Sequence, residues 1–306
     1  MERRLTNRMG KTDSILTAEI KMLDSLRTRG LQAILLLFSL CTFISIIKVF
    51  RLVNIKGIRF RRRFMALKYV GVYLARSFDH RRRGDCLKNH YCFLNNHMTK
   101  ECINDIAKGE IILWEELSYD IISISFNIPY YDMEGDLGVT FYVGLEPVYH
   151  MSFTIIKGNL LGIDEDNIVF ITRVQGVVGT FDMIRRATKE LDDIAPMVIL
   201  FTAIQAISTA FEIKSIAGIT AREQIVVGDM EPVERFHNSY DSFWIKMGGI
   251  KINNAAFLLP TVPQDAPLNM IKKNHRCRTK YKRQLRLVVY KHVLRTFQQK
   301  VHKAGD

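Results

Sequence analysis

Residues 138–176 read GVTFYVGLEPVYHMSFTIIKGNLLGIDEDNIVFITRVQG. Three runs of β-branched and aromatic residues, at 138–144, 148–156 and 167–173, alternate here with turn residues such as Glu146-Pro147 and Gly158-Asn159. A run of the same kind precedes them at 121–128. Short apolar runs separated by brief turns are typical of neighbouring strands joined by hairpins. The pattern therefore predicts an antiparallel meander.

Two helical segments follow the meander. The first covers 180–193 and stops before Pro196, and the second, which is very apolar, covers 196–211. The short apolar run SIAGIT at 215–220 predicts a buried strand that returns to the sheet. Strands first, then helices, then a returning strand indicate an α+β fold with helices packed on a mixed, mainly antiparallel sheet. The fold of the GNAT acyltransferases is one form of this arrangement.

The chain before this domain has a basic, helical pattern. Residues 31–47 (LQAILLLFSLCTFISII) carry no charge and predict an apolar helix that is either buried in protein or associated with a membrane. Residues 51–83 hold eleven Lys and Arg against one acid, Asp79, and predict a basic amphipathic helix, and 85–107 predict a helical pair. Charge and periodicity change near residue 108, so we expect a helical region at 1–108 and an α+β domain at 109–306.

The net charge of +13 is distributed unevenly. Residues 1–100 carry +15, residues 101–260 carry −12, and residues 261–306 carry +10, with a basic helix predicted at 272–303. Basic flanks of this kind can bind an anionic membrane surface or fold back on the acidic centre. Nucleic-acid binding is less favoured, because the aromatic residues do not alternate with the basic ones as a stacking platform requires. We expect a cytoplasmic chain that can associate with an anionic membrane surface.

The cysteines and histidines give no reason to expect a metal. Five cysteines, an odd number at irregular spacing, fit a reducing compartment. The nearest approach to a zinc pattern is Cys86, Cys92, His97 and Cys102, which lack the closely spaced pairs typical of structural sites. We therefore predict no metal site.

Four boxes of residues carry a resemblance to a known family. They are His90-Tyr91-x-Phe93-Leu94; Phe170-Ile171-x-Arg173-Val174-Gln175-Gly176; Ile184-Arg185-x-Ala187-Thr188-Lys189-x-Leu191 with Pro196; and Ser239-Tyr240-Asp241-x-Phe243-Trp244-x-x-x-Gly248-Gly249. Through these boxes the chain resembles the VirK/YbjX family of Gram-negative bacteria over residues 85–295. None of the boxes is a catalytic signature of known chemistry.

The resemblance implies a virulence-associated accessory protein of the cell envelope. Members of that family are linked to the localisation of outer-membrane and surface proteins and to resistance against cationic antimicrobial peptides, with no established catalytic activity or cofactor. An envelope protein is then an expected partner. The chain departs from the family at 220–226, where TAREQIV replaces a Ser-Asn-x-His-Val-Tyr pattern. Any chemistry that needs that histidine would be missing here.

A second hypothesis comes from the strand-to-helix turn at 173–180. Backbone amides and the positive end of the following helix are placed there to receive a phosphate. GNAT acyltransferases bind the pyrophosphate of coenzyme A at such a turn, with an Arg/Gln-x-x-Gly-x-Gly/Ala sequence; here the second glycine comes one residue late. The ligand-binding candidates are Arg173, Gln175, Gly176, Gly179 and Thr180, with acyl-CoA as ligand. Alternatively, the two glycines only allow a tight turn.

Four further residues have a functional and a structural interpretation each. Lys189 could reach an anion at the turn or form a salt bridge with a neighbouring acid. Tyr240 and Asp241 are the candidates for acid and base catalysis, with Trp244 in the wall of a ligand pocket. In the structural alternative, Asp241 is the N-terminal cap or a first-turn acid of a short helix that ends at Gly248, and Trp244 is a core residue.

Overall fold

The computed structural model describes residues 44, 46, 48, 68–109, 111–117, 121–129, 132–226 and 240–300. The chain divides into two compact units, Met1–Ile47 and Lys48–Asp306, and all elements discussed below belong to the second. Nearly all of the apolar helix predicted at 31–47, most of the basic helix predicted at 51–83, and Ser239 lie outside the described residues. The boundary predicted near residue 108 falls inside the second unit, between α6 and β1.

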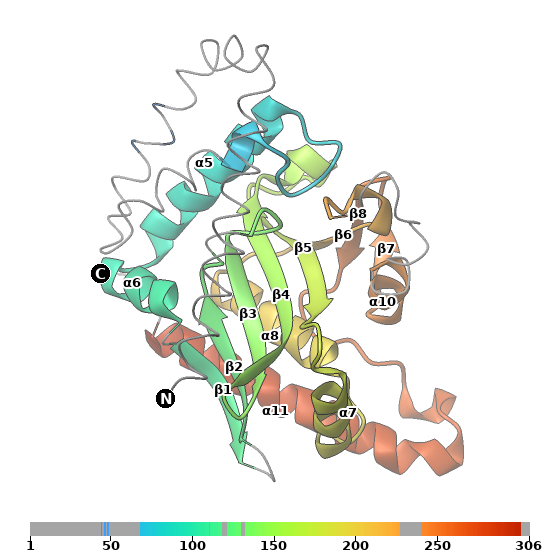
Figure 1. Cartoon of the computed structure of the whole chain (residues 1–306). Coiled ribbons are helices and arrows are strands. Elements are labelled where there is room, and N and C mark those ends of the chain that lie inside the picture. The colour runs from blue at the N-terminus through green and yellow to red at the C-terminus, as the bar shows by residue number, and fades with distance from the viewer. Residues whose placement is uncertain are drawn as a thin grey trace. The chain divides into compact units, whose positions relative to one another are not determined.

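A mixed sheet organises the described part of this unit (Figure 1). Its strands are β1 (Ile111–Leu117), β2 (Ile121–Asn127), β3 (Leu137–Val143), β4 (Glu146–Ile156), β5 (Ile168–Gly176), β6 (Ile216–Ile219), β7 (Ile250–Lys251) and β8 (Ala256–Leu259). The spatial order is β1-β2-β3-β4-β5-β6-β8-β7. Strands β5 and β6 are parallel, whereas the other neighbouring pairs are antiparallel. The predicted α+β class and the antiparallel meander are confirmed.

The helices follow the predicted order with shifted ends. They are α5 (His80–His97), α6 (Lys100–Lys108), α7 (Phe181–Glu190), α8 (Pro196–Ala210), α10 (Asp241–Lys246) and α11 (Arg276–Lys300), with short 3-10 turns η1 (Lys68–Val70), η2 (Gly158–Leu161), η3 (Ala221–Glu223), η4 (Leu268–Met270) and η5 (Lys273–His275). The predicted pair at 85–107 corresponds to α5 and α6. Thr99 separates them, because its hydroxyl accepts from the amide of Cys102 and caps α6.

The prediction of continuous basic helix through residue 83 is wrong at 71–79, which are not helical. Leu74 adopts a positive φ of 62°, and its amide donates to the carbonyl of Met133. The amide of Arg76 donates to the carbonyl of Glu223 in the same way. Hydrogen bonds to two distant loops therefore replace the helical ones in this segment, which a count of basic residues cannot reveal.

One face of the sheet is apolar and is covered by α8 and α11. Phe126 on β2 stacks on Phe153 with ring centroids 6.4 Å apart and meets Phe297 of α11 at 5.6 Å. Phe297 in turn lies 4.9 Å from Phe211 at the end of α8. Burial of these rings joins both helices to the sheet. The opposite face carries polar side chains between β2 and β5, and the candidate site lies there.

Helix α5 covers the part of β4 that extends past β3. There the amide of Ile155 donates to Nδ1 of His90 at 3.1 Å, and Asn89 donates to the Ile155 carbonyl at 3.3 Å. Side chains of α5 thus take the place of a neighbouring strand at this edge. The histidine of the His90 box therefore has a structural role in this chain.

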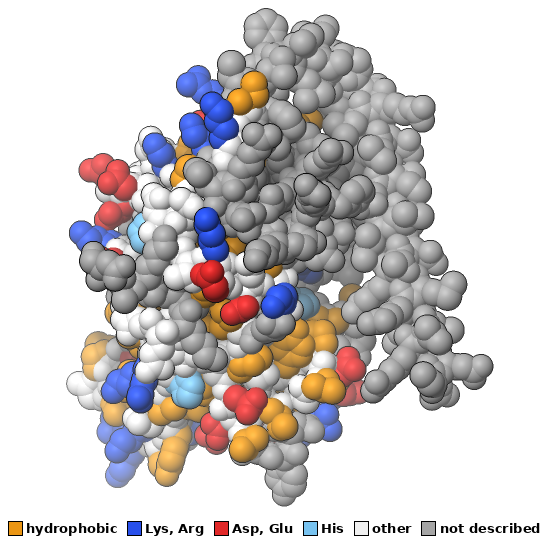
Figure 2. Space-filling model, turned by 90° about the vertical axis from the view of Figure 1, so that its left-hand side faces the viewer, with side chains coloured by type: hydrophobic (Ala, Val, Ile, Leu, Met, Phe, Trp, Pro, Cys, Tyr) orange, Lys and Arg blue, Asp and Glu red, His pale blue; other side chains and the backbone are white. Residues whose placement is uncertain are grey.

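Part of the basic C-terminal flank forms ion pairs within the chain. Arg278 of α11 pairs with Asp193, and Arg283 lies 3.3 Å from Asp265. On the face shown in Figure 2, acidic and basic side chains are interspersed over the described part. Among the described residues, no helix combines the length and the hydropathy that a bilayer span requires.

Candidate functional site

An acidic loop, 132–136, folds over the polar face of the sheet. Gly135 makes this approach possible, because a Cβ atom there would lie 2.7 Å from Cβ of Ser152 and 2.9 Å from the amide nitrogen of Phe153. The hydroxyl of Thr172 on β5 donates to the carbonyl of Glu134 and holds the loop from the other side. The loop thereby brings the carboxyl groups of Asp132 and Glu134 against β4 and β5.

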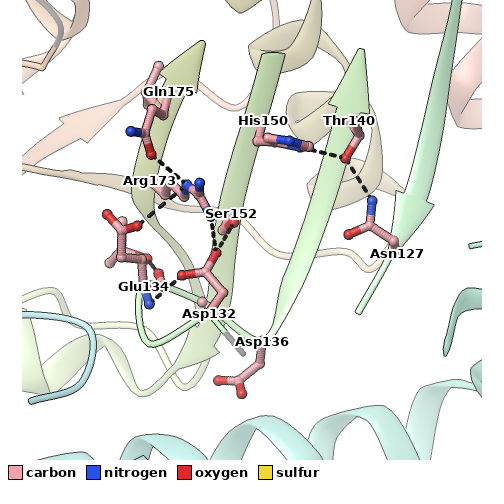
Figure 3. A network of polar contacts seen from close by, with 12 residues as sticks. Asn127, Asp132, Glu134, Asp136, Thr140, His150, Ser152, Arg173 and Gln175 are labelled. Carbon is pink, nitrogen blue, oxygen red and sulfur yellow. Dashed lines mark hydrogen bonds and ion pairs between the residues drawn. The ribbon is translucent and has the colours of Figure 1, made fainter. Parts of the chain in front are cut away.

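Arg173 lies at the centre of this cluster (Figure 3). Its Nη1 is 3.1 Å from Oδ2 of Asp132, and its Nε is 3.4 Å from Oε2 of Glu134. Its Nε also donates to Oε1 of Gln175 at 3.1 Å, while Ser152 donates to Asp132 at 2.7 Å. Burial alone would lower the pKa of Arg173, but the two carboxyl groups raise it. The guanidinium is therefore held in place by charged partners.

The Glu134 carboxyl is tuned to titrate close to neutral pH. Burial, and next the charge of Asp132, raise its pKa to about 8, against the opposing effects of Arg173 and Gln224. A carboxyl group with a pKa near the working pH can both accept and donate a proton. Such perturbed groups are enriched at functional sites. Glu134 is therefore the strongest acid-base candidate of the site.

Strands β5 and β6 pair only from Val169 to Ile171. Past that point β5 carries an irregularity opposite Ser152 and Phe153, which leaves Thr172 out of the register with β4. Beyond Ile171, two side chains contact the edge of β5 that no longer pairs with β6. Nε2 of Gln224 donates to the Thr172 carbonyl at 2.6 Å, and the hydroxyl of Tyr240 accepts from the amide of Val174 at 3.2 Å.

A cavity of about 110 Å³ lies beside these two side chains. Its lining consists of Glu134, Tyr149, Val174, Gln175, Gly176, Gln224, Val226 and Tyr240. Burial, and next the neighbouring Glu134, raise the pKa of Tyr240, so the phenol keeps its proton at neutral pH. The cavity thus places a titratable carboxyl and a protonated phenol in one wall.

A larger groove of about 330 Å³ lies over β2, β3 and β4. Arg173 lines this groove and also contacts Glu134 and Gln175, which line the smaller cavity. Asn127, Thr140, His150 and Ser152 line it as well (Figure 3). The contacts of Arg173 with Glu134 and Gln175 therefore link the groove to the lining of the smaller cavity.

Three of the residues predicted from the sequence line the smaller cavity, namely Gln175, Gly176 and Tyr240, and a fourth, Arg173, contacts Gln175. Arg173 and Gln175 lie within β5, which runs to Gly176, and not in a turn as predicted. Gly176 is held against Tyr149 and Ile184, since a Cβ atom there would lie 3.2 Å from Cδ1 of Ile184. The turn between β5 and α7 lies after Gly176, at residues 177–180.

Several polar groups of this turn form hydrogen bonds with other groups of the chain. The amide of Val177 donates to the carbonyl of Val148 at 3.0 Å, and the hydroxyl of Thr180 donates to the carbonyl of Val177 at 2.8 Å. Gly179 supplies a positive φ of 85°. Lys189 is exposed in the last turn of α7, at the far end of the helix from the turn.

Asp241 and Trp244 lie in structural contacts. Oδ1 of Asp241 accepts from the amide of Ala221 at 2.7 Å, and Tyr240, not Asp241, precedes the first helical residue of α10. Trp244 is fully buried and donates from Nε1 to the carbonyl of Ile219 at 2.8 Å. These two residues fix α10 against β6 and η3.

Sequence reasoning missed Asp132, Glu134, His150 and Gln224. The three acids at 132–136 looked like an ordinary turn. A usable signal was Gly135 between two acids, directly before the buried strand at Leu137. Gln224 falls in the segment where the chain departs from the VirK/YbjX pattern, which drew attention to a missing histidine and away from the glutamine.

Within the described ranges, no cluster of His, Cys, Asp and Glu is arranged to hold a metal ion. A family model described as "Protein of unknown function (DUF535)" matches residues 34–292. No curated protein matches the chain. No solved structure matches it either.

Proposed function

The chain belongs to the DUF535 family, and from its VirK/YbjX-like boxes we propose that it is an accessory protein of the Gram-negative envelope. In this role it supports the localisation of outer-membrane or surface proteins and resistance to cationic antimicrobial peptides. It works from the cytoplasm, with the anionic face of the inner membrane or an envelope protein as its partner. The resemblance supports this proposal, and the basic flanks are compatible with it.

For the molecular activity we propose acyl transfer from an acyl-CoA. The observation that carries this proposal is the departure of β6 from β5 after Ile171. The amide of Val174 and the carbonyl of Thr172 then face side chains and not a strand. A linear ligand with amide groups, such as the pantetheine arm of coenzyme A, can pair with such a strand edge. For that the side chains of Gln224 and Tyr240 must move aside.

The chemistry follows from the two titratable groups in the cavity wall. An acceptor amine or hydroxyl attacks the thioester carbonyl, and Glu134 takes the proton that the acceptor loses. A carbon–nitrogen or carbon–oxygen bond forms while the carbon–sulfur bond breaks. Tyr240, which holds its proton at neutral pH, donates it to the departing thiolate, and the proton held by Glu134 then passes to the Tyr240 phenolate, so that both groups return to their starting state. Before the ligand enters, Glu134 and Tyr240 both contact Gln224, at 2.6 and 2.7 Å, so both groups lie beside the cavity that receives the thioester.

The size of the cavity limits what it receives. At about 110 Å³ it is smaller than the roughly 300–1,000 Å³ of typical ligand pockets. It therefore takes the thioester end of the substrate, whereas the phosphates lie outside, toward the start of α7. A short acyl group fits this space better than a long chain.

The test is release of free thiol from acetyl-CoA by the full chain, with and without small amines. We expect release that rises with pH up to about 8, following Glu134, and a loss of roughly 100-fold or more in Glu134→Gln. Tyr240→Phe should slow release as well, and Gly176→Trp should block it. Glu116→Gln and Tyr281→Phe, which change exposed side chains, are the controls. Absence of thiol release and of a thermal shift at millimolar acyl-CoA would remove the proposal.

The envelope role has its own test. A strain that lacks the chain should become more sensitive to a cationic peptide, and wild-type chain should restore resistance where Glu134→Gln does not. Membrane docking predicts that the chain sediments with membranes in low salt and leaves them in high salt. A chain that stays in the supernatant at low salt contradicts the membrane partner.

A further inference from the structure

The groove over β2, β3 and β4 has the size of a small-molecule site. Its volume of about 330 Å³ falls in the range of roughly 300–1,000 Å³ that such sites occupy. The acyl-transfer chemistry uses the smaller cavity and leaves this groove without a ligand. The lining side chains define the chemistry of that ligand.

The described lining of the groove offers little net charge. The Arg173 guanidinium is matched by Asp132 and Glu134. Burial, and next the charge of Arg173, lower the pKa of His150 to about 4, so its imidazole is neutral at physiological pH. Lys108 at the rim lies 3.8 Å from Asp105. A neutral polar ligand is therefore favoured over an ion.

A chain of hydrogen bonds sets the proton positions in the groove (Figure 3). Nδ2 of Asn127 can only donate, so at 2.8 Å the Thr140 hydroxyl accepts from it. Among the described residues, Nδ1 of His150, at 2.9 Å, is the acceptor left for the hydroxyl proton of Thr140, so we assign the proton to this contact. The neutral imidazole therefore carries its proton on Nε2. Among the described residues none accepts from this Nε2 or donates to Oδ1 of Asn127, which leaves one donor and one acceptor.

An aromatic ring lies beside these polar groups. Gly138, Val139, Thr140 and Tyr142 of β3 all contribute to the lining of the groove, whereas Phe141 is buried and does not line it. The Tyr142 side chain is half-buried and lines the groove. An aromatic ring offers an apolar face to carbon–hydrogen groups of a ligand, next to side chains that both donate and accept.

We propose that this groove binds a neutral sugar ring. Each hydroxyl of a pyranose is both a donor and an acceptor, which matches the Nε2 donor of His150 and the Oδ1 acceptor of Asn127, and the carbon–hydrogen face of the ring packs on Tyr142. In the context of the proposed acyl transfer, on which this step rests, a sugar hydroxyl or amino group is the acceptor. Arg173 lines the acceptor groove and contacts Glu134 and Gln175, which line the cavity that holds the thioester, so its contacts link the two.

The direct test is saturation-transfer NMR of the full chain with methyl glucoside, methyl galactoside, methyl mannoside and N-acetylglucosamine. A neutral dipeptide and inorganic phosphate serve as probes of other ligand classes. We expect transfer to at least one glycoside and a shift of the His150 Nε2 signal when that glycoside is added. Preferential binding of the dipeptide or phosphate, or an unchanged His150 signal, overturns the proposal without any variant.

Variants locate the binding. Tyr142→Ala and Thr140→Val should each weaken glycoside binding by ~10-fold, the loss expected for one aromatic contact or one hydrogen-bonding group. The matched controls, Tyr281→Ala on α11 and Thr188→Val on α7, should bind as wild type does. Equal affinity in all four variants overturns the assignment to this groove. Glycoside binding without thiol release from acyl-CoA would support the sugar site and contradict the proposed acyl transfer. Thiol release without glycoside binding would support the acyl transfer and contradict the sugar site.

Discussion

The side-chain amide of Gln224 donates to the carboxyl of Glu134 across 2.6 Å, although the two residues are 90 positions apart. The same Nε2 lies 2.6 Å from the carbonyl of Thr172 and 2.7 Å from the hydroxyl of Tyr240. One nitrogen therefore connects the acidic loop, β5 and the start of α10. Gln224, which the sequence analysis did not single out, therefore helps to hold the polar site together beside Arg173, which it did.

Gln224→Ala should destabilise the chain by about 1–3 kcal/mol, because it leaves buried acceptors without their donor. Urea unfolding at pH 7 measures this loss. Arg222→Ala is the matched control, since Arg222 lies in the adjacent short helix, η3, and is exposed. A Gln224→Ala variant as stable as the control would show that water replaces the glutamine at no cost.

Glu134 should make stability fall as the pH rises from about 4.5 to about 8. Its pKa is raised from 4.5 in the folded chain, so in this window the folded state keeps a proton that the unfolded state has lost. Glu134→Gln keeps the oxygen that Gln224 contacts and removes the titration. Each pKa unit corresponds to about 1.4 kcal/mol, so the wild type should lose a few kcal/mol more than the variant between pH 5 and pH 8.

Urea unfolding at these two pH values provides the comparison. Glu116→Gln, an exposed change on β1, should follow the wild type. Parallel pH profiles of wild type and Glu134→Gln would contradict the raised pKa of Glu134. An increase of wild-type stability toward pH 8 would also contradict the predicted direction of the pH dependence.

The meander and the following helices were predictable because their signals are local. Period-two runs at 121–128 and 148–156, and the stop at Pro196, fix elements whose hydrogen bonds are near in sequence. The strands β7 and β8 were missed because two and four residues give too short a pattern, and they exist through pairing with β6. The segment 71–79 was misjudged because its hydrogen bonds reach Met133 and Glu223.

The candidate site was predictable only where a motif coincided with it. Arg173, Gln175, Gly176 and Tyr240 came from boxes of similarity; the fold brings the last three to one cavity and places Arg173 in contact with Gln175. Glu134 and Gln224 could not be found in this way, because their importance arises from burial beside β5. Burial raises the pKa of Glu134, and burial is a property of the folded chain.

Lys68→Met should be strongly destabilising, by about 3–5 kcal/mol, because it leaves Asp136 buried without its cation. Nζ of Lys68 lies 3.1 Å from Oδ1 of Asp136, and both side chains are 0% exposed. Thermal or urea unfolding measures the effect. The control is Lys108→Met, whose exposed ion pair with Asp105 should contribute about 1 kcal/mol or less. Equal losses in the two variants would mean that hydrogen bonds from Tyr73 and Thr154 suffice to hold Asp136.

Gly218→Ala should destabilise the chain by about 1–3 kcal/mol or more through overpacking. A Cβ atom there would lie 2.5 Å from Cε2 of Trp244, and the indole cannot easily shift because its Nε1 donates to the carbonyl of Ile219 at 2.8 Å. Gly71→Ala is the control, since nothing lies within 4 Å of a Cβ atom at that position.

A double-mutant cycle separates this contact from a general intolerance of β6 to substitution. Trp244→Phe removes the part of the indole that the added methyl group would meet, so Gly218→Ala should cost less in that background than in the wild type. The expected coupling free energy is about 1 kcal/mol or more, and its sign makes the double variant more stable than additive losses would. Strictly additive losses would mean that the alanine is disfavoured for another reason, such as its effect on the pairing of β6 with β5 and β8. The position of Trp244 would then not be what requires glycine at residue 218.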